Sequence, residues 1–135
     1  MKMRSRLVVL MFVGIVIFSC GQQDKSPATA QSKRITSPTE LLGKNLFLQK
    51  CAACHAVQKE LIGPPLAGAQ ERWNDNSRLY AFIKNAPKAI EEDKYAKDLW
   101  EKYNRTLMTP FPELTDADID AIFEYVNAQV KQVDL

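Results

Sequence analysis

The segment Cys51-Ala52-Ala53-Cys54-His55 constrains this chain more than any other feature of its sequence. Two thiols three positions apart can add to the two vinyl groups of one porphyrin, and the histidine that follows then lies within reach of the iron. The pattern C-x-x-C-H is accordingly the attachment signature of c-type haem. His55 is also the only histidine in the sequence. We therefore expect one covalent haem c, with His55 as a ligand of its iron.

Two other kinds of site contain a C-x-x-C pair. A redox dithiol is expected near a β-α-β pattern, which this sequence does not contain. A zinc site usually needs two further cysteine or histidine ligands. The chain offers only Cys20 besides the motif itself. Both alternatives therefore account for the sequence less well than haem attachment does.

The N-terminus predicts export. Three basic residues precede an apolar run of twelve, residues 7–18, which is shorter than the ~20 residues of a membrane-spanning helix. The end of this run, Ile17-Phe18-Ser19-Cys20, resembles a bacterial lipobox. The resemblance implies a lipoprotein-type signal peptide at residues 1–19 and acylation of Cys20. An ordinary signal cleaved nearby, or an uncleaved anchor, is the alternative interpretation.

Acylation of Cys20 would also account for the odd cysteine, because an unpaired thiol is a liability in an oxidising compartment. Residues 20–36 are rich in polar and small residues without periodicity, which indicates a flexible tether. The folded domain is expected over residues 37–135. Without the three signal cations, 15 basic residues face 16 acidic ones. Such a balance gives no support to nucleic-acid binding.

The rest of the chain predicts helices. Ser37, Pro38 and Glu40 form a helix start with a capping box, and this helix should run to about residue 50. Further helices are expected over residues 76–85, where a proline follows, and over residues 90–104. Thr115 and the acidic residues after it predict the cap of a last helix. No segment alternates like a strand, so the fold class is all-α.

Met108 is the candidate for the second axial ligand. The other methionines belong to the signal peptide, so Met108 is the only one of the mature protein. A thioether opposite a histidine raises the reduction potential of a haem iron. The alternatives are a methionine that only fills a gap in the core and ligation by a lysine.

From about Ser37 to the C-terminus the chain resembles class I cytochrome c. The residues that carry the resemblance are Gly43, Phe47, the C-x-x-C-H motif, Gly63-Pro64-Pro65-Leu66, Met108-Thr109-Pro110-Phe111 and Tyr125. The resemblance implies about four to five helices around one covalent haem. It also implies that the terminal helices cross where Gly43 and Phe47 meet Tyr125.

The same resemblance implies roles for residues around the haem. The carbonyl of Pro64 would accept a hydrogen bond from the second ring nitrogen of His55. Trp73 or Arg72 would bond a haem propionate. Independently of the resemblance, Tyr80, Trp100 and Tyr103 are assigned to the core by default.

With both axial positions filled by protein, one-electron transfer is the reaction that remains. We therefore expect an electron carrier rather than an enzyme, held on the periplasmic side of the cell membrane by its lipid. Its expected partners are proteins of a respiratory chain, a quinol-oxidising complex on one side and a terminal oxidase or reductase on the other. One alternative is a haem subunit of a larger oxidase or dehydrogenase complex. A gas-binding sensor or enzyme is the other, should Met108 be a labile ligand.

Overall fold

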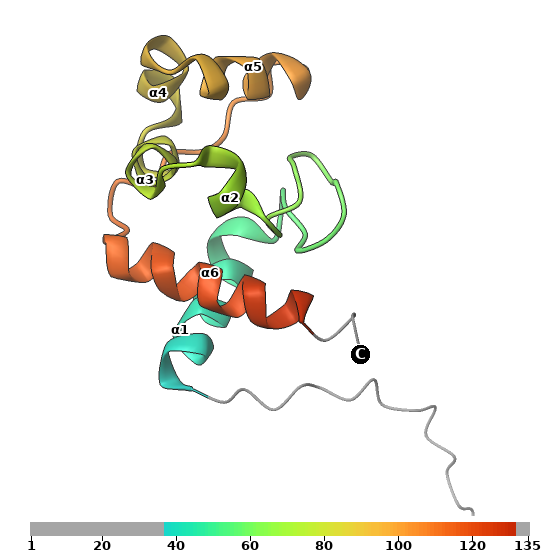
Figure 1. The fold of residues 1–135 in the computed structure, drawn as a ribbon, viewed down its shortest axis with the longest axis vertical. Coiled ribbons are helices and arrows are strands. Elements are labelled where there is room, and N and C mark those ends of the chain that lie inside the picture. The colour runs from blue at the N-terminus through green and yellow to red at the C-terminus, as the bar shows by residue number, and fades with distance from the viewer. Residues whose placement is uncertain (1–36, 132–135) are drawn as a thin grey trace, which may run out of the picture. The chain divides into compact units, whose positions relative to one another are not determined.

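The computed structural model describes residues 37–131. In this range all regular secondary structure is helical, and there is no strand (Figure 1). The expected all-α class is therefore confirmed. Six α-helices and one π-helical turn follow one another, which is more than the four to five helices expected. They are α1 (Pro38–Leu46), η1 (Phe47–Cys51), α2 (Ala69–Trp73), α3 (Asn76–Lys84), α4 (Ala86–Glu92), α5 (Lys94–Lys102) and α6 (Asp116–Val130).

The expected signal peptide (1–19), the expected tether (20–36) and the lipidation site Cys20 lie outside the described residues. Within residues 37–131, each helix is too short or too polar to cross a membrane.

The first and last helices cross at a glycine, as expected. The side chain of Ser37 caps α1 by accepting a hydrogen bond from the backbone N–H of Glu40 at 2.9 Å. A Cβ atom on Gly43 would lie 1.8 Å from the carbonyl oxygen of Ala121 in α6. Only glycine therefore allows the two backbones to approach this closely. One turn later, the rings of Phe47 and Tyr125 contact each other with centroids 5.5 Å apart.

The last turn of the first helix is wider than a regular α-helix. The N–H of Ala52 donates to the carbonyl of Phe47 at 2.9 Å, an i→i+5 bond. This π-helical turn, η1, leads directly into the C-x-x-C-H motif. Such turns are rare and occur often at functional sites. The sequence predicted a regular helix here, because hydrophobic spacing does not distinguish the two over one turn.

The helix α6 begins with the predicted cap. The Thr115 hydroxyl accepts from the N–H of Asp118 at 3.1 Å, and the Asp118 carboxylate accepts from the N–H of Thr115 at 2.9 Å. This reciprocal pair satisfies two backbone donors of the first turn. The helix contributes five buried residues to the described core: Ile119, Ala121, Ile122, Phe123 and Val126.

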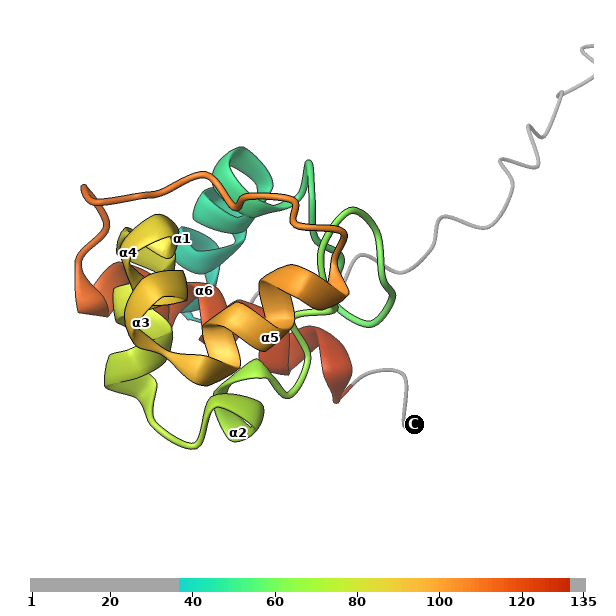
Figure 2. The same cartoon turned by 90° about the horizontal axis from the view of Figure 1, so that it is seen from above.

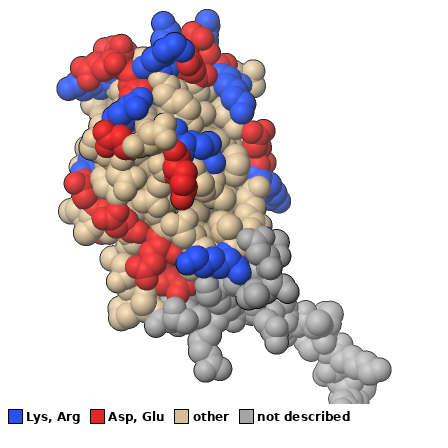
Figure 3. Space-filling view, viewed as in Figure 1, with Lys and Arg blue, Asp and Glu red and all other residues tan. Residues whose placement is uncertain are grey.

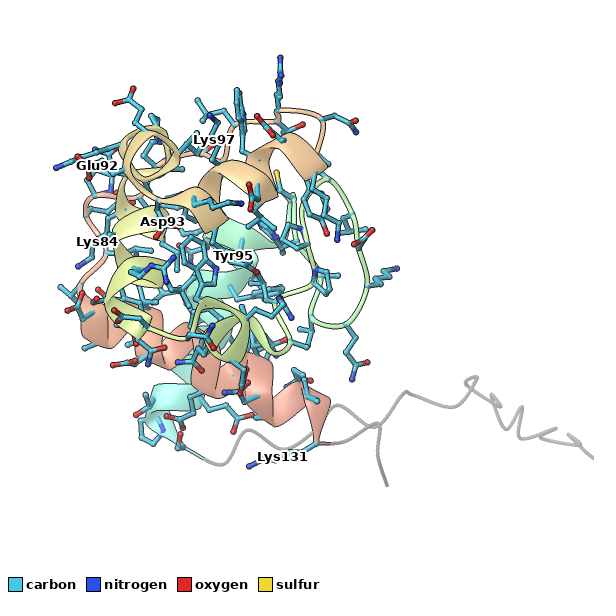
Figure 4. The ribbon with its side chains drawn as sticks, turned by 45° about the horizontal axis from the view of Figure 1, so that its top comes forward. Lys84, Glu92, Asp93, Tyr95, Lys97 and Lys131 are labelled. Atoms are coloured by element: carbon cyan, nitrogen blue, oxygen red, sulfur yellow. The ribbon has the colours of Figure 1, made fainter. Side chains whose placement is uncertain are left out.

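The middle of the chain differs from the sequence prediction. In place of one helix over residues 90–104, the structure has α4 and α5, with Asp93 between them in an extended conformation. Pro87 lies in the first turn of α4, where proline is tolerated because that N–H has no helical partner. Asp93 lies at the junction of the two helices (Figure 4). Its carboxylate caps α5 by accepting from the N–H of Ala96 at 3.0 Å.

Asp93 is also bound by an arginine from α3. Arg78 donates two hydrogen bonds to its carboxylate, at 2.6 and 2.9 Å. This partner comes from a different helix, so the break between α4 and α5 depends on tertiary contacts that no local pattern records.

The short helix α2 places a tryptophan in the core. Trp73 is buried, and its ring contacts those of Phe82 (centroids 5.1 Å apart) and Tyr95 (4.9 Å apart). Left-handed residues bound the helix on both sides, Gly68 at φ +67° and Asn74 at φ +58°. Its five residues are too few to show a hydrophobic period, and the sequence did not predict it.

Charged side chains of both signs mix on the surface. On the face drawn in Figure 3, basic and acidic residues alternate over α4 and α5, and acidic residues gather over α6. Lys84 pairs with Asp116, and Lys94 pairs with Asp98, each at 2.5 Å. Exposed pairs of this kind contribute little to stability.

Candidate functional site

The two motif cysteines follow η1 in a tight turn. The N–H groups of Cys54 and His55 both donate to the carbonyl of Cys51, at 3.0 and 2.9 Å. Cys51 is half-buried, and burial raises the pKa of its thiol to about 11, whereas Cys54 is exposed. A redox-active dithiol needs a thiol with a lowered pKa. The environment of Cys51 therefore does not suit a redox dithiol.

His55 is held by the backbone of the loop after it. Its Nδ1 lies 2.8 Å from the carbonyl oxygen of Pro64. A carbonyl can only accept, so Nδ1 carries the proton and the lone pair lies on Nε2, the nitrogen that can ligate a metal. A Cβ atom on Gly63 would lie 2.4 Å from Cε1 of the imidazole. A glycine at this position thus lets the histidine ring lie against the loop backbone.

Arg72 holds the same loop from the other side. Its guanidinium donates to the carbonyls of Ala67 at 2.6 Å and Pro65 at 2.7 Å. The sequence assigned Arg72 or Trp73 to a haem propionate. In the described residues the polar atoms of Arg72 engage the loop, and Trp73 packs in the core. Arg72 thus helps to hold the loop. Arg72 and Trp73 also border the smaller hollow, so their assignment to a propionate stays a prediction.

Two adjoining hollows, of about 120 and 70 Å³, lie beside the motif. Their walls are mainly apolar. The residues that line both hollows are Cys51, His55, Pro64, Phe82, Leu99, Met108 and Phe111. His55 and Met108 come from segments more than fifty residues apart, yet they border the same space. An apolar cavity that joins two thiols, an imidazole and a thioether fits a covalent haem with histidine and methionine as axial ligands.

The segment that carries Met108 is held to two other elements by residues that follow the methionine. Phe111 donates its N–H to the carbonyl of Ile83 in α3 at 3.1 Å, and Glu113 pairs with Lys50 of η1 at 2.6 Å. Figure 2 shows this segment between α5 and α6 passing the end of the first helix. Before Met108, Asn104 and Arg105 both adopt left-handed conformations, at φ +56° and +58°. These contacts hold the segment against α3 and η1, and Met108 lines both hollows.

Trp100 presents an unpaired hydrogen-bond donor at the cavity. Its indole Nε1 is buried and has no partner among the described residues, and the side chain lines the larger hollow. A buried N–H without a partner is costly, and a carboxylate of the cofactor would supply one. From the sequence we assigned Trp100 to the core, and Trp73 to a hydrogen bond with a haem propionate. No pattern distinguished the two tryptophans, because the difference lies in which indole N–H meets the cavity.

The rim of the larger hollow combines a polar bridge with exposed apolar residues. Tyr103, at the end of α5, donates to Glu60 in the loop after the motif at 2.6 Å. Burial, followed by this bond, raises the pKa of Tyr103 to about 12. Leu61, Ile62 and Leu107 are each about half exposed beside the bridge. The rim therefore offers an apolar surface on which another molecule can approach the cavity.

Comparisons with known proteins agree with this geometry. The model of the family "Cytochrome c" matches residues 41–129. The chain is 28% identical over 102 residues to cytochrome c-551 of Bacillus subtilis, which covers 70% of this chain and 90% of that protein. It is 31% identical over 90 residues to cytochrome c6 of Cyanidioschyzon merolae, over 67% of this chain and 74% of that one. The solved cytochrome c from Rhodothermus marinus superposes with a TM-score of 0.59 at 25% identity, over 77% of this chain and 87% of its own.

Proposed function

This chain belongs to the cytochrome c family, and from that premise we propose that it is a membrane-anchored one-electron carrier that serves a respiratory chain. The coarser statements follow from the family itself: the protein binds haem c covalently, with iron, and functions in haem-based electron transfer. The proposal adds the axial ligands, the anchor, the compartment and the partners.

The observation that carries the proposal is that His55 and Met108 border the same apolar cavity. Cys51 and Cys54 hold the haem through thioether bonds in this proposal, and the cofactor supplies an iron centre that gains or loses one electron. The Pro64 carbonyl keeps the Nε2 lone pair of His55 directed at the metal. Met108 would supply the second protein ligand, so that the iron would have no open position for a substrate.

In this proposal, electrons pass between the haem and a redox partner at the rim of the larger hollow. Ile62 and Leu107 line the larger hollow and are about half exposed, and Leu61, next to Ile62 in the chain, is exposed as well. Interfaces have apolar centres, and transient redox encounters need only small areas. A redox partner can therefore approach the cavity closely without displacing either axial ligand.

The anchor and the compartment rest on the N-terminus. A lipid on Cys20, after a signal peptide at residues 1–19, places the domain on the periplasmic side of the cell membrane. Residues 20–36 then act as a tether that lets the domain reach its partners. These partners are a quinol-oxidising complex and a terminal oxidase or reductase.

The first test is the visible spectrum of the reduced holo-protein before and after addition of carbon monoxide. We expect an unchanged low-spin c-type spectrum, because both axial positions are filled. Met108→Ala should open one position, bind carbon monoxide and lower the reduction potential. A spectral shift in the parent protein would contradict the carrier function and favour a gas-binding sensor or enzyme. Co-purification with a large complex at fixed stoichiometry would instead indicate a fixed subunit.

A further inference from the structure

Three exposed leucines lie on the outer side of α1 and η1. Leu41, Leu42 and Leu48 are exposed by 47%, 45% and 54%, and the residues between them on this face, Asn45 and Gln49, are exposed and uncharged. We call these five residues the leucine face. Lys44, which is partly exposed, is the charged residue beside them. Large exposed apolar patches mark interaction sites.

The fold gives these leucines no internal role. The opposite side of the same helix makes the contact with α6, through Gly43 at the crossing and Phe47 against Tyr125. Residues seven apart share one face of a helix, so Leu41 and Leu48 point away from that contact together. The leucine face is therefore available to something outside the described residues.

The position of the leucine face in the chain favours a lipid bilayer as its occupant. The proposed lipid on Cys20 lies 17 residues before Ser37, where α1 begins. A flexible segment of this length keeps its ends on average about 20–25 Å apart. The first turns of α1 are thus the part of the fold that the anchor holds nearest to the membrane. Exposed leucines beside one lysine, Lys44, suit the interfacial region of a bilayer, where a lysine can extend its ammonium group to the headgroups.

We propose that the leucine face lies on the membrane surface and sets the orientation of the domain. The proposal rests on the lipid anchoring proposed above. Figure 1 shows the start of α1 at the opposite end of the described residues from α5. With the first turns of α1 on the bilayer, the end of the fold that carries α5 lies farthest from it. The rim of the cavity then remains accessible to partners while the domain rests on the membrane.

The test uses the full-length, mature holo-protein on vesicles of phosphatidylcholine and phosphatidylglycerol. A photoactivatable phosphatidylcholine with a diazirine on its acyl chain labels residues that touch the bilayer. Trypsin releases residues 35–44 and 45–50, which carry the leucine face, and residues 60–72, which carry the exposed Leu61. We expect several-fold more label in the first two peptides than in the third.

A pair of variants provides the control. Leu41→Gln together with Leu48→Gln should lower the labelling of peptides 35–44 and 45–50 several-fold. Leu61→Gln removes a leucine of similar exposure elsewhere and should leave that labelling unchanged. Co-sedimentation with vesicles is measured for every sample, because the acyl group on Cys20 should by itself keep both variants on the vesicles.

The outcomes separate this proposal from the anchoring. Protein that co-sediments but carries label mainly on residues 60–72, or equally on all three peptides, would overturn the orientation and leave the anchored carrier intact. Protein that fails to co-sediment would contradict the anchoring, and the orientation with it. Cross-links between two copies through residues 35–44, formed in detergent as readily as on vesicles, would assign the leucine face to a second copy instead.

Discussion

Trp100 illustrates how a single atom can define a binding role. Its buried Nε1–H lacks a partner among residues 37–131 and lines the hollow beside His55. A carboxylate that accepts this hydrogen bond is stabilised in its charged form, which lowers its pKa. The loss of this donor should therefore be visible in the titration of a haem propionate.

We predict that Trp100→Phe moves the pH dependence of the reduction potential to higher pH, because it removes the N–H donor while an aromatic ring is kept. The measurement is the midpoint potential as a function of pH for the parent and the variant. Trp73→Phe is the matched control, because Trp73 packs against Phe82 and Tyr95. A shift in Trp73→Phe with none in Trp100→Phe would support Trp73, the residue assigned to the propionate from the sequence.

The residues of the site differ in how far sequence could identify them. Cys51, Cys54 and His55 follow from a motif with fixed chemistry, and Met108 follows from being the only methionine after residue 20. Trp100 and Trp73 carry the same donor, and only the coordinates show which one is buried without a partner. Arg72 was likewise chosen for its charge, but its guanidinium binds two backbone carbonyls of the loop.

At the scale of elements, the crossing of α1 and α6 depends on the absence of one side chain. We predict that Gly43→Ala destabilises the holo-protein by about 1–3 kcal/mol, because the new Cβ would overlap the Ala121 carbonyl. For a domain of this size, each kcal/mol lowers the melting temperature by about 4–8 °C. Thermal unfolding followed at the haem absorbance measures the effect.

Asn45→Ala is the control for Gly43→Ala, since it adds helix propensity at an exposed position of the same helix. It should leave the melting temperature unchanged or raise it slightly. An equal effect of the two substitutions would contradict the close approach of the backbones.

The junction of α4 and α5 predicts a dependence of stability on acid pH. Hydrogen bonds from Arg78 are the main cause that lowers the pKa of Asp93 from its ordinary 3.8 to about 2. A carboxyl group whose pKa falls on folding stabilises the native state above its unfolded pKa. This contribution is therefore complete above about pH 4 and is lost as the pH falls through about 2.

Asp93→Asn should remove that pH dependence and keep the helix cap, because asparagine also caps well. The measurement is the free energy of unfolding of the parent and the variant across the acid range. The two curves should diverge above about pH 4 and converge as the pH approaches 2. Parallel curves would show that the Arg78–Asp93 pair does not couple folding to protons.

The helices themselves were predictable to different degrees. The starts of α1 and α6 were predictable, because their capping residues lie within three positions of the partners they bind. The break at Asp93 was missed although its cap on Ala96 is local, because the pair with Arg78, fifteen residues away, is not visible in the sequence pattern. Helix caps made by neighbouring residues can be predicted from the sequence, whereas a contact between two helices cannot.

At the scale of the whole molecule, the cavity lies where the core would otherwise close. Both hollows are bordered by core residues such as Phe82, and together they are lined by η1, α2, α3, α5, α6 and the Met108 segment. A domain of about a hundred residues has little stability to spare. The cofactor is therefore expected to fill space that these side chains alone leave empty.

We predict that Cys51→Ala with Cys54→Ala, which prevents covalent attachment, removes cooperative unfolding or lowers the melting temperature severely. Circular dichroism against temperature measures this. Met108→Ala is the control, because it keeps the thioether bonds and should still unfold cooperatively. A double variant that melts like the parent would mean that the polypeptide folds without its cofactor.

The π-helical turn between Phe47 and Cys51 affects how this family member tolerates changes in length. A turn with i→i+5 bonds holds one residue more than an α-helical turn. Deletion of Leu48 or Gln49 can therefore be absorbed by conversion to a regular helix, and Cys51 would still face the cavity. Deletion of Asn45, in the regular part of α1, would instead rotate Gly43 out of line with Phe47. Insertions and deletions among relatives should thus concentrate within η1, just before the cysteines, and be rare in the four residues that precede it.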